Sequence, residues 1–577
     1  MTQNRKQNEK QRRPVQKKGV KLIRSVAKAG LISLVSVSAL SLHASAQTLF
    51  VKANGYTLNH KNQLQRFDAM LVDDAGKVLA VGTQKQLEKK FANHKQIDLA
   101  GKTVLPGLID AHGHIFNLGQ AESQLGLRST NSLAEAQTAI AQYAAKFPQQ
   151  QWILGGEWNQ AIWKLGRFPT AQEIDSVLAD RPVWLRRVDG HAGWANSKAM
   201  QLAGINLETP DPVGGKIERD SKGQATGIFV DSAMHLIERV IPAKNEAERR
   251  LALDAALKQM RSVGLTSVHD AGVDAQADAL FREYANKHSL TTRVYGMISG
   301  VDQFFDSVSK QGPLLGMADD RYALRAVKLY SDGALGSRGA ALLAPYSDAP
   351  HTKGLLFSAD KDMQAMVQKA AARGYQVNVH AIGDAGNRQV IGSLATIPKA
   401  QDASVLRHRI EHAQVLELSD IPRVAQLKII PSMQPTHATS DMNMAEDRVG
   451  KQRIKGAYAW RTFLKQGSPI PCGSDFPIES PNPFWGIYAA VSRQDFDQKP
   501  VKGWYPEQAM TVKEAFRCFT LDAAYAGHQE KILGSLEPGK WADFIVIDQD
   551  IFKVPVKDLY KTQVLQTWLA GQQVYRK

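Results

Sequence analysis

The sequence predicts an α/β protein: a TIM-type (β/α)8 barrel with a large insert after strand one, plus a small β-sandwich-like domain formed from both termini. Three observations predict this fold. Eight short β-rich segments recur along the chain, helical patterns separate several of them, and β-rich segments of similar texture occupy both ends. Alternating strands and helices are typical of a parallel barrel, whose functional groups lie at the carboxyl ends of the strands.

Composition indicates an ordinary globular protein. The chain has 577 residues, of which 43% are hydrophobic and 22% are charged. Its formal net charge is +16, but residues 1–46 hold ten Lys or Arg and one Glu, a balance of +9 that leaves +7 for the rest. The charge is therefore weak support for a nucleic-acid partner. We expect a small-molecule substrate and no nucleic acid, and a homo-oligomer stays open.

Residues 1–46 have the pattern of a signal peptide. A basic stretch at residues 5–28 precedes an apolar run at 29–40, and the small residues Ala44, Ser45 and Ala46 follow. The protein is therefore expected to be exported to the periplasm or secreted, with no stable membrane span after cleavage. The apolar run is shorter than the roughly 20 residues of a membrane helix. An uncleaved membrane anchor is the alternative.

Both ends of the remaining chain predict short strands. Residues 68–73, a turn at 74–77 and residues 78–82 resemble a hairpin. Strand-like runs at 542–548 and 564–574 have the same character. We therefore predict one composite β-domain from residues 47–102 and 530–577, which leaves residues 103–529 for the barrel.

The predicted barrel strands are residues 104–114, 264–270, 292–298, 324–330, 375–380, 406–412, 428–434 and 469–475. The gap of about 150 residues between the first two is far longer than an ordinary connection. It contains strand-like runs at 152–158 and 182–191 and a hairpin pattern at 216–229. We predict an insert subdomain over the active face, spanning about residues 120–255.

The chain has two cysteines, Cys472 and Cys518. An exported protein could pair them, and the sequence alone does not decide this. Because Cys472 lies in an apolar segment, we expect a buried free thiol there.

Potential metal ligands end several of the predicted strands. In an extended chain, residues two apart share one side, so His112 and His114 can face one point. Other strand-end side chains are expected to converge with them. The side chains expected to converge are His112, His114, Lys328, His380, His412 and Asp475. Histidine and aspartate together favour a divalent transition metal.

Ordered motifs at these strand ends carry a resemblance to a known family. They are Val-Leu-Pro-Gly-Leu-Ile-Asp-Ala-His-Gly-His at 104–114, His-Ala-Ile-Gly-Asp at 380–384, Glu-His-Ala at 411–413 and Gly-Ser-Asp at 473–475. From about residue 48 to the C-terminus, the chain resembles the amidohydrolase superfamily. The segments 189–197 and 327–338 resemble its N-substituted formamide deformylase-like branch.

The resemblance implies a site for one or two divalent ions, usually zinc. His112 and His114 would bind the first ion, with Asp475 completing that site, and His380 and His412 would bind the second. Lys328 would bridge both ions as a carbamate. If Lys328 is unmodified and pairs with an acid or substrate instead, the site would keep a single ion.

The resemblance also implies a reaction. A metal-activated hydroxide would attack a carbonyl carbon, and Asp475 would move the proton from water to the leaving group. The expected function is hydrolysis of a C–N bond in a non-peptide amide or formamide. Ester or lactone hydrolysis, deamination, and a non-catalytic regulatory protein that retains the fold are the alternatives.

Four further residues are candidate substrate contacts. His191 could reach the substrate or stabilise an oxyanion, or could simply fix a turn. Asp332 and Arg338 follow Lys328 on a loop at the same face, although a structural ion pair is the favoured role for Arg338. Trp158 could line an apolar pocket, with core packing as the alternative.

Overall fold

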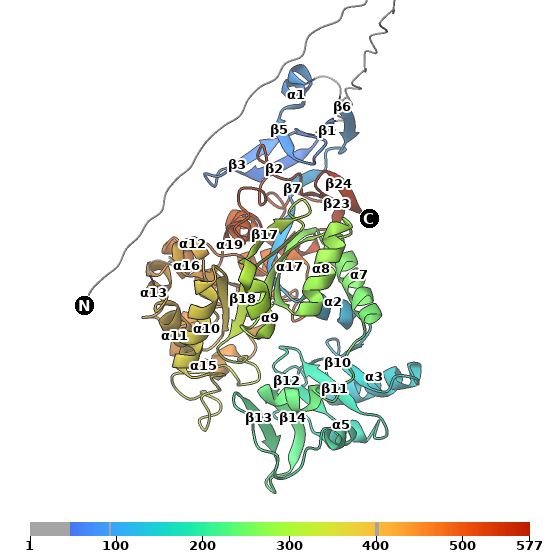
Figure 1. The fold of residues 1–577 in the computed structure, drawn as a ribbon, viewed down its shortest axis with the longest axis vertical. Coiled ribbons are helices and arrows are strands. Elements are labelled where there is room, and N and C mark those ends of the chain that lie inside the picture. Colours follow the sequence, from blue (N-terminus) through green and yellow to red (C-terminus); the bar gives the residue numbers. More distant parts are fainter. Residues whose placement is uncertain (1–46, 92–93, 399–402) are drawn as a thin grey trace, which may run out of the picture. The chain divides into compact units, whose positions relative to one another are not determined.

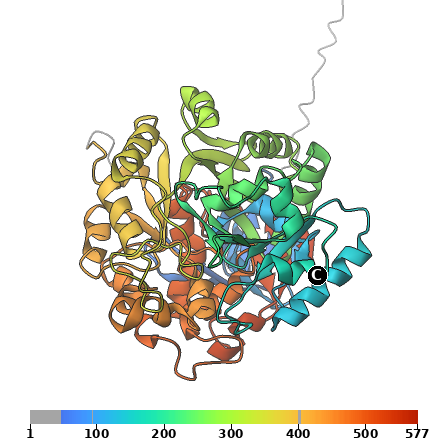
Figure 2. The ribbon, with the colours of Figure 1, turned by 90° about the horizontal axis from the view of Figure 1, so that it is seen from below.

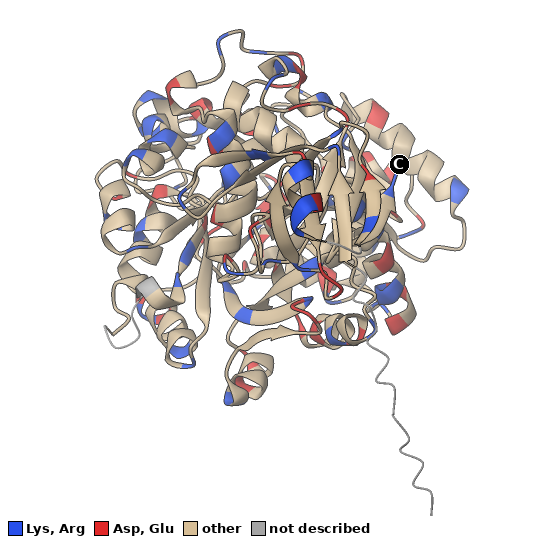
Figure 3. Ribbon diagram, turned by 90° about the horizontal axis from the view of Figure 1, so that it is seen from above, with Lys and Arg blue, Asp and Glu red and all other residues tan. Residues whose placement is uncertain are grey.

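A computed structural model describes residues 47–91, 94–398 and 403–577 of the chain. The predicted signal peptide lies outside these described residues. Within them, no helix combines the length and apolar character needed to cross a bilayer. Figure 3 shows Lys and Arg interspersed with Asp and Glu over the ribbon viewed from above.

Parallel strands in chain order form the barrel wall. They are β8 (Leu108–Gly113), β15 (Leu265–Val273), β16 (Arg293–Ser299), β18 (Tyr322–Tyr330), β19 (Gln376–Ala381), β20 (Arg409–His412) and β21 (Ile430–Ser432). Each pairs in parallel with the next. In Figure 2 the colours pass from green through yellow to orange around the centre, as successive β/α units of a barrel should. The predicted barrel is confirmed.

The eighth predicted strand is not a regular strand. Residues 469–475 contain Pro469 and Pro471, which lack the N–H groups that a ladder requires. The segment still closes the barrel through parallel bridges from Cys472 to Met433 and from Phe476 to Gly113. This closing segment, residues 469–476, therefore carries Asp475 between β21 and β8.

The first predicted strand divides at Gly107. Thr103–Pro106 forms β7 in a terminal sheet, and only Leu108–Gly113 (β8) belongs to the barrel. A Cβ atom at Gly107 would overlap Thr266 of β15. The glycine thus allows the chain to pass closely from one sheet to the other.

Two sheets are built mainly from the ends of the described chain. One has the order β5-β4-β1-β6 and the other β24-β23-β22-β7-β2-β3. Their strands are β1 (Gln47–Val51), β2 (Asn54–Leu58), β3 (Leu64–Phe67), β4 (Ala69–Val72), β5 (Val78–Gly82), β6 (His94–Asp98), β22 (Phe544–Ile547), β23 (Val564–Leu569) and β24 (Gln572–Arg576). The predicted hairpin is the antiparallel pair β4–β5. Phe50, Phe544 and Trp568 pack in one buried cluster with ring centroids 4.9–5.3 Å apart.

The insert forms a sheet of its own with the order β13-β14-β12-β11-β10-β9. Its strands are β9 (Leu125–Gly126), β10 (Ile153–Trp158), β11 (Val183–Arg187), β12 (Ala192–Ala195), β13 (Gly215–Arg219) and β14 (Ala225–Asp231). The two predicted strand-like runs correspond to β10 and β11, and the predicted hairpin to β13–β14. Figure 1 shows the insert and the terminal sheets at opposite ends of the barrel.

Helices connect and flank the strands. The first ten are α1 (Gln84–Lys90), α2 (Ile115–Ala121), α3 (Leu133–Lys146), α4 (Ala171–Asp175), α5 (Ser197–Leu202), α6 (His235–Glu238), α7 (Glu246–Ser262), α8 (Ala275–Asn286), α9 (Gln303–Val308) and α10 (Asp360–Ala372). The others are α11 (Asp384–Leu394), α12 (Ala403–Leu406), α13 (Ile421–Gln426), α14 (Pro435–Asp441), α15 (Ala445–Arg453), α16 (Trp460–Lys465), α17 (Pro483–Ser492), α18 (Val512–Arg517) and α19 (Ala523–Ala526). A short strand, β17 (Leu314–Met317), pairs antiparallel with β18. Asn245 and Glu248 form a capping box that fixes the start of α7.

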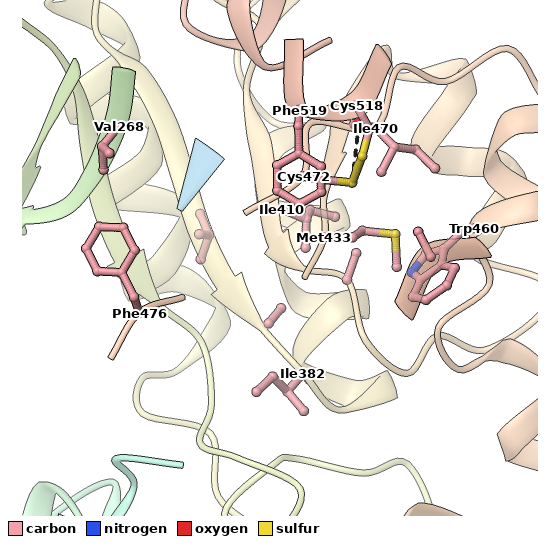
Figure 4. Packing of buried hydrophobic residues seen from close by; sticks show 14 of the residues in the cluster. Val268, Ile382, Ile410, Met433, Trp460, Ile470, Cys472, Phe476, Cys518 and Phe519 are labelled. Carbon is pink, nitrogen blue, oxygen red and sulfur yellow. Dashed lines mark hydrogen bonds between the residues drawn. A yellow bond between two sulfur atoms is a disulfide. The ribbon is translucent and has the colours of Figure 1, made fainter. Parts of the chain in front are cut away.

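The expected free thiol at Cys472 is wrong, because Cys472 and Cys518 form a disulfide. Figure 4 shows the bond among buried side chains that include Phe519 and Ile470. The backbone N–H of Cys472 also donates to the carbonyl of Cys518, at 3.1 Å. Burial in an apolar segment suits a disulfide as well as a thiol, so it could not distinguish the two states.

Candidate active site

His112, His114 and Asp475 form a compact group at the barrel mouth. His112 is on β8, His114 precedes α2, and Asp475 is on the closing segment. The Nε2 atoms of His114 and His112 lie 3.1 and 3.4 Å from Oδ1 of Asp475. Donors bound about 2.1 Å from one cation are at most about 4.2 Å apart. These distances therefore fit ligands of a single ion.

Backbone bonds hold this group together. The N–H of Asp475 donates to the carbonyl of His112 at 2.7 Å. Asp110 accepts bonds from the backbone N–H of His112 (3.0 Å) and from the Ser474 hydroxyl (2.6 Å). Asp475 itself has a positive φ of 60°, a conformation that costs free energy and persists where surrounding contacts enforce it. The barrel closure thus sets the position of this carboxylate.

A second group consists of His412, His437 and Asp475, whose potential ligand atoms all lie within 4.8 Å of one another. His412 ends β20 with a φ of 74°, and its Nδ1 lies 2.8 Å from Oε1 of Gln434. That bond orients the ring and leaves Nε2 for another partner. His437, on α14, was not predicted from the sequence.

Lys328 and His380 lie next to these groups. Lys328, on β18, is 1% exposed, and its Nζ lies 3.0 Å from Nε2 of His112. Burial lowers the pKa of Lys328 to about 8. The His380 ring, on β19, lies 4.5 Å from the ring of His412, but its Nε2 is 3.4 Å from the carbonyl of Gly333. All six predicted ligand residues therefore meet at this mouth, with Lys328 and His380 outside the two compact groups.

The electrostatic environment suits a metal site. Burial and the nearby Lys328 lower the pKa of His112 to about 4. Burial also holds the pKa values of His380 and His412 well below the ordinary range for histidine. Their imidazoles are therefore neutral at pH 7, the form that binds metals. Oδ1 of Asp475 and Nε2 of His437 are buried without a hydrogen-bond partner, so the residues present fit a bound cation.

Glu411 orients His112 from behind. Its Oε2 lies 2.5 Å from Nδ1 of His112, and Arg409 donates to the same oxygen at 2.9 Å. Burial raises the pKa of Glu411, but Arg409 and His112 outweigh this effect and lower the pKa to about 2. The carboxylate is therefore ionised. A carboxylate that accepts the Nδ1 proton directs Nε2 toward the metal. The sequence contains a signal for this pairing. Arg409 and Glu411 stand two residues apart on β20, so both side chains face the barrel interior, where opposite charges are expected to pair.

A pocket of about 390 Å³ lies over these groups. The insert contributes Arg128, Glu157, Arg187, Asp189 and His191 to its lining, and the barrel contributes His380, His412, His437 and Asp475. Nδ1 of His191 lies 2.7 Å from Oδ1 of the buried Asp231. Of the four predicted substrate contacts, His191 is therefore placed at the pocket.

The other three predicted contacts have structural partners instead. Asp332 is fully buried and accepts the backbone N–H groups of Ala341, Ile382 and Gly383 at 2.8–2.9 Å. Arg338 forms an ion pair with Asp348 at 2.9 Å. Their bonds explain why neither is among the residues that line the pocket.

Trp158 packs in the core of the insert. Its indole N–H donates to the carbonyl of Leu185 at 2.7 Å, and its ring lies about 6 Å from those of Trp163 and Trp194. Its neighbours Glu157 and Asn159 line the pocket instead. Successive side chains of a strand point to opposite sides, so Trp158 points away from the pocket. The prediction that Trp158 lines the pocket is therefore wrong.

The fold and the donor groups are those of a (β/α)8 barrel with a candidate metal site at its mouth. The model of the amidohydrolase family matches residues 95–575, and the chain belongs to this family. YtcJ of Bacillus subtilis (strain 168) is 31% identical over 526 residues, which are 91% of this chain and 98% of YtcJ.

Two further proteins extend the comparison. N-substituted formamide deformylase of Arthrobacter pascens is 29% identical over 557 residues, 92% of this chain and 98% of that enzyme. The crystal structure of an uncharacterized metal-dependent hydrolase from Pyrococcus horikoshii OT3 aligns with a TM-score of 0.72 and 26% identity. It covers 89% of this chain and 99% of that chain.

We predict that Glu411→Gln weakens zinc binding about 10- to 100-fold, because the amide no longer accepts the His112 proton as an anion. Competition with a chelating dye measures the dissociation constant. Glu530→Gln is the matched control, since Glu530 pairs with Arg407 outside the site. Equal zinc affinities of Glu411→Gln and wild-type protein would contradict the orienting role.

Proposed function

We propose that this protein is a metal-dependent hydrolase that cleaves the C–N bond of a non-peptide amide or formamide. One observation carries the proposal: the unpartnered Oδ1 of Asp475 lies beside two imidazole donors at the floor of a pocket large enough for a small molecule. The similarity to N-substituted formamide deformylase supports the bond type.

Each residue has a defined task in this proposal. A divalent cation held by these donors supplies Lewis acidity, which acidifies water and polarises a carbonyl. Burial opposes ionisation of Asp475, but His112 and His114 hold its pKa well below the usual range. The ionised carboxylate accepts a proton from water and delivers it to the leaving nitrogen. Because Asp231 holds Nδ1 of His191, Nε2 is the ring atom left for the substrate.

Zinc is the proposed metal, and Lys328 its proposed ligand as a carbamate, which the neutral amine forms with carbon dioxide while releasing one proton. A lysine ammonium 3.0 Å from His112 Nε2 would repel a cation at that donor, whereas a carbamate would supply two oxygen atoms. The burial of Lys328 removes competing water from this position. We predict that a crystal structure of the zinc-loaded protein shows carbamate density continuous with Nζ. Density for an unmodified amine at full zinc occupancy would contradict the carbamate.

We also propose export to the periplasm or the cell exterior. The buried disulfide supports this, because such bonds persist in oxidising compartments. Intact-mass measurement of the protein secreted by its own host is predicted to give a chain beginning at Gln47, after Ala46. A mass that retains residues 1–46 would indicate the uncleaved anchor instead.

Turnover is the direct test. Zinc-loaded protein is expected to hydrolyse members of a panel of N-substituted formamides and amides, and chelation is expected to abolish this. We predict that Asp475→Asn lowers kcat about 10²- to 10⁴-fold, since positioned proton transfer contributes about that much. Metal content is measured in the same samples, so that a lost ion is distinguished from a lost base.

Several outcomes would contradict these expectations. A near wild-type rate for Asp475→Asn would remove its role in proton transfer. Preferential turnover of esters, lactones or ring amines in matched panels would identify one of the alternative reactions. No turnover at full zinc occupancy would favour the regulatory protein.

A further inference from the structure

A second pocket, of about 660 Å³, adjoins the pocket over the donor groups. Its lining includes residues of α2, α14 and α17, and α14 packs against α17. The described residues around it include none of the candidate metal ligands. The residues that line both pockets are Arg128, Glu157, Thr439, Ser440, Glu479 and Asp495. A molecule that extends beyond a simple amide can therefore occupy both pockets at once.

Negative charge predominates in the lining of the second pocket. The carboxylates are those of Glu122, Glu157, Glu479 and Asp495. Among the described lining residues, Arg128 is the only Lys or Arg. Arg128 is already engaged, because its Nη2 donates to Glu157 at 2.9 Å and to the carbonyl of Ile478 at 2.6 Å. Its charge is therefore compensated within the protein, which leaves the pocket unsuited to an anion.

Glu479 and Asp495 have no cationic partner within residues 47–91, 94–398 and 403–577. Glu479 is partly buried and forms no ion pair in these ranges. Asp495 uses Oδ1 to accept the backbone N–H of Lys499 at 2.8 Å. Both carboxylates line the two pockets. Charge of one sign in a concave site attracts a ligand of the opposite sign, so this junction favours a cation.

One face of α14 adds hydroxyl groups to the same lining. Thr439 and Ser440 follow Thr436 by three and four residues, so the three side chains share one side of the helix. The hydroxyls of Thr439 and Ser440 donate to helix carbonyls at 3.0 and 3.3 Å, which leaves their oxygens able to accept. Thr436 is 7% exposed, and its Oγ1 is buried with no hydrogen-bond partner. A buried unpaired hydroxyl in a pocket lining calls for a ligand or water, and the neighbouring acceptors favour a ligand that donates.

Aromatic side chains complete the lining. The ring of Phe496 lies 4.8 Å from that of Trp485 and 6.0 Å from that of Tyr488. Phe496 directly follows Asp495 and is 43% exposed, and the Tyr488 hydroxyl donates to the carbonyl of Asp495 at 2.8 Å. Aromatic rings pack against apolar groups and attract cations to their faces. The second pocket therefore suits a cation that is carried on an apolar group.

We propose that the second pocket binds the distal part of the substrate, and that this part is an organic ammonium on an apolar group. The ammonium pairs with Glu479 and Asp495 and donates to the hydroxyls of α14, while the apolar group packs against the aromatic rings. This inference rests on the proposed function, because it extends the amide substrate of that site. It narrows the substrate class to amides with a cationic, partly apolar substituent.

Calorimetric binding of phenethylammonium tests the proposal without turnover. To the protein as purified, this cation is expected to bind about 10-fold more tightly than phenethyl alcohol, since two partly exposed charge pairs are each worth about 2- to 5-fold. Hydrocinnamate, which places a carboxylate on the same apolar group, is expected to bind more weakly than the alcohol. Chelation of the metal is expected to leave the affinity for the ammonium unchanged, because the second pocket contains none of the candidate metal ligands.

Variants locate the bound cation. Glu479→Gln and Asp495→Asn are each expected to weaken binding of phenethylammonium about 2- to 5-fold and to leave binding of the alcohol unchanged. Thr436→Val keeps the shape of the side chain and is expected to weaken binding of the ammonium as well. Glu88→Gln on α1 is the matched control, since it removes the same charge outside the lining of both pockets.

Three binding results would overturn the proposal. The first is equal affinity for the cation, the alcohol and the carboxylate. The second is an unchanged affinity for phenethylammonium in the double variant Glu479→Gln, Asp495→Asn. The third is loss of binding on chelation, because it would place the amine at the metal instead of in the second pocket.

Turnover distinguishes this inference from the proposed function. In matched formamides and amides, a distal ammonium is expected to raise kcat/KM about 10-fold over a distal hydroxyl, mainly through a lower KM. Hydrolysis of the panel without this preference would overturn the inference alone. No hydrolysis, with the binding preference for the ammonium intact, would refute the proposed function and leave the ammonium site in place.

Discussion

The hydrogen bond from the N–H of Asp475 to the carbonyl of His112 joins the two ends of the barrel wall. It links the closing segment to the first barrel strand at the level of the donor atoms. The N–H groups of Ala111 and His114 donate to the carbonyls of Cys472 and Phe476, each at 2.9 Å, so the segment stays bonded to the first strand although it contains two prolines. The relative position of His112, His114 and Asp475 therefore depends on how the barrel closes.

Much of the donor set could be predicted because parallel topology fixes where strands end. Once eight β/α units are recognised, residues such as His112, Lys328 and His412 must share one mouth. His437 could not be found in this way, since it lies on a helix after its strand. Glu411 was not predicted, because it directly precedes the candidate ligand His412 and contacts His112 from behind the site.

Other differences arise from packing that a sequence pattern does not encode. Trp158 and the pocket-lining Glu157 occupy adjacent positions of β10, so a one-residue change decides which side chain meets the pocket. The division at Gly107 has a similar cause, since one extended run serves two sheets. In both places hydrophobicity predicted a strand but could not predict its neighbours.

The candidate donor groups and much of the polar pocket lining come from different parts of the chain. Barrel residues hold the donor groups, whereas the insert supplies polar pocket residues such as Arg128 and Asp189. These insert residues lie outside both candidate ligand groups. The pocket can therefore differ among relatives while the donor groups stay in place, as expected where function depends on sites rather than on the fold.

The disulfide lies only three residues before Asp475 in the sequence. It links the closing segment to the π-helical segment Cys518–Asp522, so a covalent brace adds to the backbone hydrogen bonds that hold the closing segment. A preparation made in a reducing compartment would lack this brace. The compartment of recombinant production is therefore part of the chemistry of the metal site, and metal contents are comparable only between samples with the same thiol state.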